Sequence, residues 1–257
     1  MPPTRHHRWV LEEPTIDASM SILYEDERII VADKPHGLAT TPRGMWYKQT
    51  ALMKIRDMYQ DENIVPAHRL DRMTAGVVVF VRQKEVRGAY QMLFQEHKTT
   101  KVYECLAPCA PVRSPLVGSV EFLNKPQVFP LIRRSRIIKE RGFMQAFEVC
   151  GEANSQTLIT APDDEAVYGI QYSRRGFPHV AYRTYRLYPL TGKTHQLRLH
   201  MSAIGLPIAG DDFYPVITQR HPQDLDHPLQ LVARTLSFTD PIDGTYREYV
   251  SQIPLSW

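Results

Sequence analysis

The apolar residues of this chain fall into short runs of strand length, separated by prolines, glycines and polar turns. β-Branched and aromatic residues dominate these runs, which is typical of β-strands. No run approaches the roughly 20 residues that a membrane-spanning helix needs. The runs that predict strands are residues 22–24, 29–32, 77–80, 101–107, 182–188, 231–238 and 246–250.

Helical periodicity is confined to three segments. The first has apolar residues at helical spacing after Thr50, which is its predicted N-cap, and the third has them after Thr194, its predicted N-cap. The second lies between two predicted strands. Many strands with few helices predict an α+β (mixed α/β) architecture instead of a doubly wound one. The periodic positions are Leu52, Ile55, Met58 and Tyr59; Val86, Tyr90, Leu93, Phe94 and His97; and Leu197, Met201 and Ile204.

Composition is that of a globular protein that folds unaided. The chain has 257 residues, 43% of them apolar and 23% charged, and a net charge of +3, which permits a nucleic-acid partner without requiring one. The N-terminus has no apolar stretch after its basic residues, so no secretory signal is expected. Three cysteines do not suggest a disulfide framework, which favours reduced thiols and a cytoplasmic protein. Cys105 and Cys109 resemble half a metal site, but no second pair has matching spacing, so no metal is expected.

The stretch from Pro66 to Phe80 carries the clearest chemical signal. It places one carboxylate, Asp71, between Arg69 and Arg72, just before the strand-like run. A carboxylate among basic side chains is biased toward its ionised form, which suits a nucleophile or a general base. The alternative is a structural ion pair at the start of a strand, since such pairs also perturb acids.

A second basic cluster lies further along the chain. Residues 133–141 contain five basic side chains, at 133, 134, 136, 139 and 141. Such a run is usually a solvated face. Given the enzyme-like signal around Asp71, we favour contacts with phosphate groups.

Four blocks, taken in order, resemble a known family. They are S-I-L-Y-E-D-E-R-I-I-V-A-D-K-P-H-G-L (21–38), H-R-L-D-R-M-T-A-G (68–76), K-V-Y-E-C-L (101–106) and L-T-G-K-T-H-Q-L-R-L-H-M-S-A-I-G-L-P-I-A-G-D (190–211). Together they resemble the RluA-type pseudouridine synthases, which isomerise uridine in ribosomal or transfer RNA. The resemblance runs from about Ser21 to the C-terminus.

The resemblance implies a pseudouridine synthase fold, with a central, mostly antiparallel sheet, flanking helices and a catalytic cleft. Residues 1–19 are expected to be an N-terminal extension, and 20–257 the catalytic domain. The extension is too short for the S4-like domain that many relatives carry, so the catalytic domain itself must recognise RNA. No heptad or long apolar face argues for an obligate dimer, so a monomer is expected, with RNA as its partner and no membrane contact.

The resemblance also implies three catalytic residues. Asp71 matches the catalytic aspartate, which attacks ribose C1′ or removes a ribose proton. Tyr103 matches the active-site tyrosine, whose ring can stack on uracil and whose hydroxyl can assist proton transfer at C5. Arg198 matches a basic residue that pairs with the catalytic aspartate. The reaction adds and removes nothing but a proton, so no cofactor is implied.

Six further residues are expected to bind substrate. A stacked uridine cannot reach Asp71, so it must leave the stack, and Arg69 matches the arginine that fills the gap. His195 and His200 lack the spacing of a helical metal pair, so a structural or RNA-binding role is favoured for them. The expected substrate-binding residues are His68, Arg69, Arg72, Thr74, His195 and Gln196.

Two residues depart from the family pattern. Ala75 stands where serine is usual, and Lys193 stands where arginine is usual, which retains charge but loses bidentate geometry. Neither residue belongs to the expected catalytic trio, so these departures bear on the choice of substrate and not on the expected activity. Two other readings stay open: a non-catalytic RNA-binding or RNA-folding protein on the same scaffold, and a hydrolase that uses Asp71 with His68 or His195.

Overall fold

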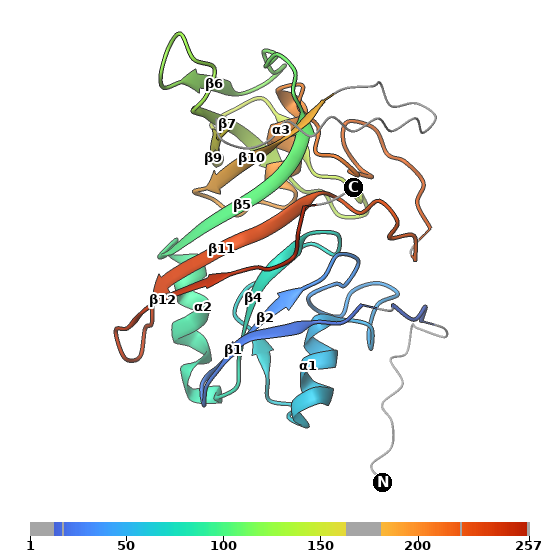
Figure 1. The fold of residues 1–257 in the computed structure, drawn as a ribbon, viewed down its shortest axis with the longest axis vertical. Coiled ribbons are helices and arrows are strands. Elements are labelled where there is room, and N and C mark those ends of the chain that lie inside the picture. The colour runs from blue at the N-terminus through green and yellow to red at the C-terminus, as the bar shows by residue number, and fades with distance from the viewer. Residues whose placement is uncertain (1–12, 17, 163–180, 222, 256–257) are drawn as a thin grey trace. The chain divides into compact units, whose positions relative to one another are not determined.

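The computed structural model describes residues 13–16, 18–162, 181–221 and 223–255 (Figure 1). The chain forms two compact units. Unit 1 comprises Met1–Thr100, His221–Pro228 and Ala233–Ile253, and unit 2 comprises Lys101–Arg220, Leu229–Val232 and Pro254–Trp257. The polar segment at 161–180 lies largely outside the described residues, as does most of the expected N-terminal extension.

Unit 1 is built on a sheet whose central strand is buried on both faces. Strands β1 (Ser21–Glu25), β2 (Ile29–Lys34) and β4 (Ala75–Val81) pair antiparallel in that order, and the short β3 (Val65–Pro66) also pairs with β4. Strands β11 (Leu231–Thr239) and β12 (Tyr246–Val250) form a further antiparallel pair. All seven residues of β4 are buried, which explains its continuous apolar run.

Helix α2 covers one face of this sheet. It spans Arg87–Gln95 after a short 3-10 turn at Lys84–Val86, and its Tyr90 and Leu93 are buried. Alternate residues of β2 and β4, including Val31 and Val79, pack in the same cluster, because side chains two apart on a strand share a face. The helical spacing around Tyr90 therefore predicted the correct element.

Helix α1 spans Ala51–Tyr59 and begins where the sequence predicts. The Thr50 side chain accepts a hydrogen bond from the backbone N–H of Met53, which confirms it as the N-cap. Leu52 and Ile55 are buried, but Met58 is exposed, so the buried stripe is shorter than expected.

The described part of the N-terminal segment packs against unit 1. The Glu13 carboxylate accepts hydrogen bonds from the backbone N–H groups of Tyr47, Lys48 and Gln49, at 2.6 to 2.8 Å. Ile16 is buried. One carboxylate thus satisfies three consecutive backbone donors in a loop, a concentrated charge-assisted contact.

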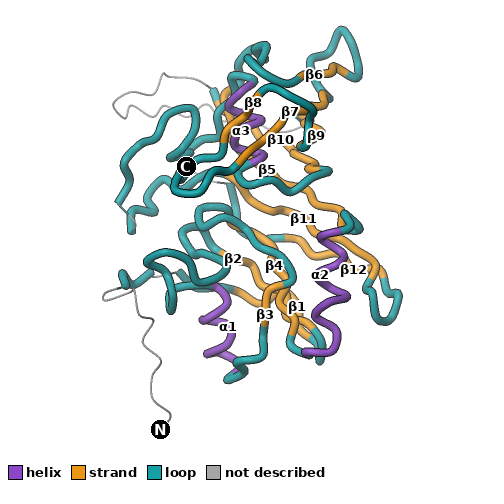
Figure 2. Tube along the Cα trace, turned by 180° about the vertical axis from the view of Figure 1, so that it is seen from behind, coloured by secondary structure: helices purple, strands orange, loops and turns teal. Residues whose placement is uncertain are grey.

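Unit 2 is a second antiparallel arrangement with one helix. Its strands run in the order β5, β10, β9, β7, β6, with β8 paired to β7 (Figure 2). Helix α3 lies on β7 and β9. The bounds are β5 (Thr99–Pro108), β6 (Ser119–Phe122), β7 (Leu131–Ile138), β8 (Phe147–Val149), β9 (Ser155–Thr160), β10 (Tyr182–Pro189) and α3 (Gln196–Ala203).

The predicted α+β class with a mostly antiparallel sheet is confirmed, while two local predictions are wrong. Thr194 does not cap α3; the N-cap is His195, in the left-handed region at φ 56°. Ala75 and Gly76 belong to β4, so this strand begins two residues before the predicted start at residue 77. Gly76 has φ 114°, and a Cβ there would overlap the backbone of Ala233, so only glycine fits.

Candidate active-site residues

The loop that carries Asp71 is fixed by hydrogen bonds on both sides of the aspartate. Leu70 is bonded through its backbone N–H and carbonyl to the Thr40 hydroxyl, at 3.0 and 2.8 Å. On the other side, the Met73 carbonyl accepts from His36 Nδ1 at 2.7 Å. Asp71 itself is half-buried and closes a turn through its carbonyl and the Thr74 N–H. The backbone around the carboxylate is therefore held firmly in place.

Lys34 supplies a buried positive charge near this loop. Its side chain is fully buried, and Nζ donates to the carbonyls of Pro35, Leu38 and Arg72 at 3.0, 2.7 and 3.3 Å. Burial lowers the pKa of Lys34 to about 7, and the charge of Asp71 opposes that shift. Our sequence reasoning assigned Lys34 no role, although the Lys-Pro step at the end of a strand marked its position.

The other predicted residues of unit 1 have mixed surroundings. Arg69 is exposed, and Thr74 is buried. His68 accepts a hydrogen bond from the Val79 N–H at 3.2 Å and stacks on Phe94 with ring centroids 4.1 Å apart. These contacts orient the His68 ring within unit 1, and the substrate contacts expected of His68 and the exposed Arg69 stay predictions.

Arg72 is held against an aromatic ring beside the Asp71 loop. Its guanidinium lies 5.4 Å from the centre of the Trp46 ring, within cation–π range. Nη1 also donates to the Gly37 carbonyl at 3.3 Å. The arginine that follows Asp71 is therefore oriented by its own unit.

Tyr103 lies on β5 in unit 2, opposite Leu187 of β10, and is half-buried. Its neighbour Glu104 accepts a hydrogen bond from Arg186 Nε across the same strand pair, at 3.2 Å. Cys105, on the same strand face as Tyr103, is fully buried, and burial raises the pKa of its thiol. The strand pairing therefore defines where the tyrosine backbone lies.

Arg198 is held by two carboxylates and two aromatic rings of unit 2. Its Nε and Nη2 donate to the two carboxylate oxygens of Asp211, at 2.8 and 2.5 Å, and Nη2 also donates to Asp212 at 2.8 Å. The rings of Phe213 and Tyr214 lie 4.8 and 5.4 Å from the guanidinium carbon. Neither aspartate was predicted from the sequence, although the fourth family-like block ends on Asp211.

His195 and Gln196 are also tied into unit 2. His195 Nδ1 hydrogen-bonds with the Tyr214 hydroxyl at 2.9 Å. Gln196 is buried; its amide nitrogen donates to Gln156 and Thr157, and its amide oxygen accepts from Thr191 and Lys193. These bonds use the full capacity of the Gln196 amide, so the geometry gives it a scaffolding role.

The phosphate contact favoured for the basic segment 133–141 does not extend to Arg133. Arg133 is fully buried and donates to both oxygens of Glu148, at 2.9 and 2.8 Å. Arg134 pairs with Glu121 at 2.7 Å. The Arg134 side chain is 33% exposed, so a phosphate contact there stays a prediction.

Behind the Arg133–Glu148 pair lies a buried polar cluster centred on His200. His200 Nε2 is 3.1 Å from the hydroxyls of Ser135 and Ser155, and Nδ1 is 2.9 Å from Thr157 Oγ1. Burial lowers the pKa of His200 to about 3, and the charge of Arg133 adds to the effect. The histidine is therefore neutral and structural, one of the two roles expected for it.

The rest of the basic segment is exposed around the end of β7. Arg136 lies on β7, and Lys139 and Arg141 lie in the turn that follows; all three are exposed. Phe143 and Met144 lie beside them and are 56% and 66% exposed. Positive side chains next to an exposed aromatic ring are a combination that suits single-stranded nucleic acid.

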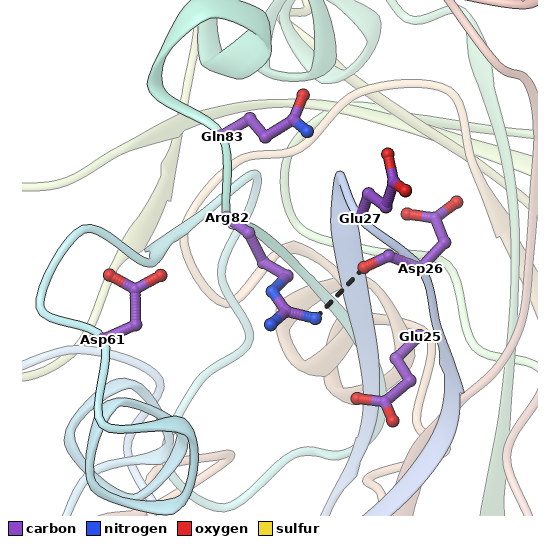
Figure 3. Close-up of a pocket in the computed structure, with 6 residues that line it drawn as sticks. All are labelled: Glu25, Asp26, Glu27, Asp61, Arg82 and Gln83. Carbon is purple, nitrogen blue, oxygen red and sulfur yellow. Dashed lines mark hydrogen bonds between the residues drawn. The ribbon is translucent and has the colours of Figure 1, made fainter.

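A hollow of about 640 Å³ in unit 1 has the opposite character (Figure 3). It is lined by Glu25, Asp26, Glu27, Asp61, Arg82 and Gln83. The guanidinium of Arg82 donates to the Asp26 carbonyl at 3.2 Å, as drawn in Figure 3. Four carboxylates against one guanidinium repel phosphate, and no predicted site residue lines this hollow.

The three predicted catalytic residues belong to different units. Asp71 lies in unit 1, whereas Tyr103 and Arg198 lie in unit 2. Their convergence on one substrate stays a prediction. Across the described residues, no three His, Cys, Asp or Glu side chains gather as a metal site would require. Nor does any described helix have the length and apolar character to cross a bilayer.

Comparison with known proteins gives consistent matches. The family model described as RNA pseudouridylate synthase matches residues 28–203. The dual-specificity RNA pseudouridine synthase RluA of Haemophilus influenzae is 30% identical over 234 residues, covering 90% of this chain and 92% of the relative. The tRNA pseudouridine synthase C of Vibrio parahaemolyticus is 29% identical over 196 residues, covering 75% and 72%.

Solved structures match at the level of the fold. Human RNA pseudouridylate synthase domain containing 4 aligns with a TM-score of 0.58 and 23% identity, over 91% of this chain and 88% of that one. Human RNA pseudouridylate synthase domain containing 1 aligns with a TM-score of 0.59 and 22% identity, over 95% and 87%.

Proposed function

The chain belongs to the RNA pseudouridylate synthase family, and we propose that it isomerises uridine in RNA to pseudouridine with Asp71, Tyr103 and Arg198. The observation that carries the assignment is the Asp71 loop: a half-buried carboxylate on a backbone pinned at Leu70 and Met73, with Lys34 nearby. A nucleophile or base must be held in a fixed position, and this loop meets that need.

The reaction breaks the bond between uracil N1 and ribose C1′ and forms a bond between uracil C5 and C1′. C5 loses its proton and N1 gains one, so the atoms balance without an added reactant. Asp71 either attacks C1′ and holds the sugar as an ester, or removes a ribose proton to give a glycal. Both routes require an ionised carboxylate.

Tyr103 and Arg198 serve the uracil and the aspartate. The Tyr103 ring stacks on the uracil while the base turns, and its hydroxyl assists loss of the C5 proton. Arg198 pairs with Asp71 through a guanidinium that unit 2 already holds rigidly. Arg69, exposed two residues before Asp71, occupies the space that the extruded uridine leaves in the RNA.

The substrate is a stem-loop of ribosomal or transfer RNA. Two similar proteins are named a dual-specificity RNA pseudouridine synthase and a tRNA pseudouridine synthase, which supports this class of RNA. The exposed basic and aromatic side chains at the β7–β8 turn provide phosphate and base contacts outside the catalytic residues. The acidic hollow of unit 1 repels the backbone and keeps RNA off that surface.

The experiment that tests the proposal is Asp71→Asn, assayed by tritium release from RNA carrying C5-tritiated uridine. We expect turnover to be abolished while RNA binding, measured by filter retention, persists. Asp57→Asn is the matched control, because Asp57 is an exposed aspartate in the same unit. Turnover by Asp71→Asn at the rate of the control would refute the assignment.

A further inference from the structure

Arg198 makes several directed bonds within unit 2. Two donor nitrogens of the guanidinium meet both oxygens of Asp211, the bidentate geometry that fixes a guanidinium plane. The Arg198 side chain is 3% exposed and that of Asp211 is 1% exposed. Solvent therefore does little to weaken this ion pair, and the guanidinium plane of Arg198 moves together with the carboxylate plane of Asp211.

Asp211 is itself anchored to the backbone. Its Oδ1 accepts hydrogen bonds from the N–H groups of Phe213 and Tyr214, at 2.8 and 2.9 Å. The Tyr214 hydroxyl in turn exchanges hydrogen bonds with the backbone of Ala146, at 2.8 and 3.0 Å. The carboxylate is thus connected through Tyr214 to the approach to β8, and its position is set before any substrate binds.

The negative charges around Arg198 outnumber its single positive charge. Two carboxylates, Asp211 and Asp212, face one guanidinium, with Nη2 shared between them at 2.5 and 2.8 Å. Asp211 and Asp212 compensate the positive charge of Arg198 within unit 2. A further group that binds Arg198 is therefore held by a directed hydrogen bond and little by net electrostatic attraction. Orientation of the guanidinium then matters more than its charge.

We infer that Asp211 is the positioning residue for Arg198: it fixes the guanidinium plane, with Asp212 as a secondary support, so that Arg198 acts as an oriented hydrogen-bond donor in the reaction. The link to the reaction rests on the proposed function. The positioning itself rests only on the contacts within unit 2. Lysine at position 198 has one donor centre and cannot replace a bidentate donor.

The first arm of the test measures orientation without activity. The Nε–H of Arg198 gives a ¹⁵N NMR signal that is identified by its loss in Arg198→Lys. We expect its exchange with solvent to speed up at least about tenfold in Asp211→Asn and less in Asp212→Asn, because a neutral amide holds a guanidinium more weakly. Glu152→Gln, at an exposed acid of the same unit, should leave the exchange unchanged. Equal exchange in all proteins overturns the inference.

The second arm measures turnover in a double-mutant cycle. We expect Asp211→Asn to lower kcat about 10-fold to 100-fold with KM for RNA changed less than about threefold, since a misplaced group costs rate more than binding. If Asp211 acts through Arg198, adding Asp211→Asn to Arg198→Lys should cost nothing further. Losses that multiply in the double variant overturn the inference, because they show an independent structural effect.

Two controls distinguish a failure of the inference about Asp211 from a loss of folding and from a failure of the proposed function. Each variant must give a cooperative thermal melt; if Asp211→Asn does not, Asp212→Asn takes its place in the cycle with the same expected non-additivity. Faster exchange together with an unchanged kcat would confirm Asp211 as the support of Arg198 and remove Arg198 from the proposed site. Loss of the catalytic assignment to Asp71 would leave the exchange result unaffected.

Discussion

The buried histidine of unit 2 predicts how the protein responds to acid. His200 is enclosed by Ser135, Ser155 and Thr157, with Arg133 and Glu148 as the charged groups that face it. Its pKa falls from 6.5 to about 3 on folding, first because of burial and then because of Arg133. Between these values the unfolded chain binds a proton at this position and the folded chain does not.

The size of the effect follows from proton linkage. Stability falls as pH falls wherever the unfolded state binds more protons, and each pH unit between 6.5 and about 3 costs up to about 1.4 kcal/mol. At pH 5 the loss from this one residue is about 2 kcal/mol. This loss is a large fraction of the total stability of a typical domain, which is about 5–15 kcal/mol.

The measurement compares urea unfolding of the wild type and His200→Gln near pH 7.5 and pH 5. Glutamine does not titrate but retains a donor and an acceptor for the surrounding hydroxyls. Glu148, whose pKa burial raises, is present in both proteins, so its contribution largely cancels. The stability advantage of the wild type should shrink by about 2 kcal/mol at the lower pH. An advantage that stays constant would show that His200 is protonated in the folded state, and the reasoning would fail.

Three further outcomes are expected. Burial lowers the pKa of Lys34 to about 7, so between pH 7 and 10 the unfolded chain binds more protons at this position than the folded chain. The free energy of unfolding of the wild type should therefore rise relative to that of Lys34→Met by up to about 1.4 kcal/mol per pH unit over this range. Parallel curves of unfolding free energy against pH for the two proteins would contradict this. Thr50→Ala should cost about 1 kcal/mol in thermal unfolding through loss of the α1 cap, whereas Thr50→Ser should not. Arg141→Ala and Phe143→Ala should each weaken RNA binding, but only the arginine change should reduce the salt dependence of the affinity; identical salt slopes would rule out the phosphate contact.

The elements with strong local signals were predictable from sequence. The α1 cap at Thr50 and the buried strand at Val77–Phe80 depend on residues a few positions apart, so their spacing alone identifies them. The Asp71 loop was also recognised, because its acid sits between two arginines just before the core strand. What sequence could not supply was Lys34 as its buried neighbour, since that contact joins positions 37 residues apart.

Long-range charge pairing explains the remaining misses. On β7, Leu131, Arg133 and Ile137 alternate on the same buried side, a pattern that the sequence contains. A charge in such a pattern is tolerated only if a partner reaches it, and Glu148 comes from another strand. His195 likewise adopts a left-handed conformation that helical periodicity does not reveal, so α3 begins one residue later than a Thr194 cap would require.

The contact of Glu13 bears on how the protein is shortened for crystallisation or NMR. Removing everything before the first strand would delete the acceptor for three adjacent amides in the 47–49 loop and expose the site that Ile16 fills. A trimmed version that starts at residue 13 or earlier keeps this loop ordered. One that starts at Met20 would loosen the surface next to Trp46, whose ring lies against the guanidinium of Arg72.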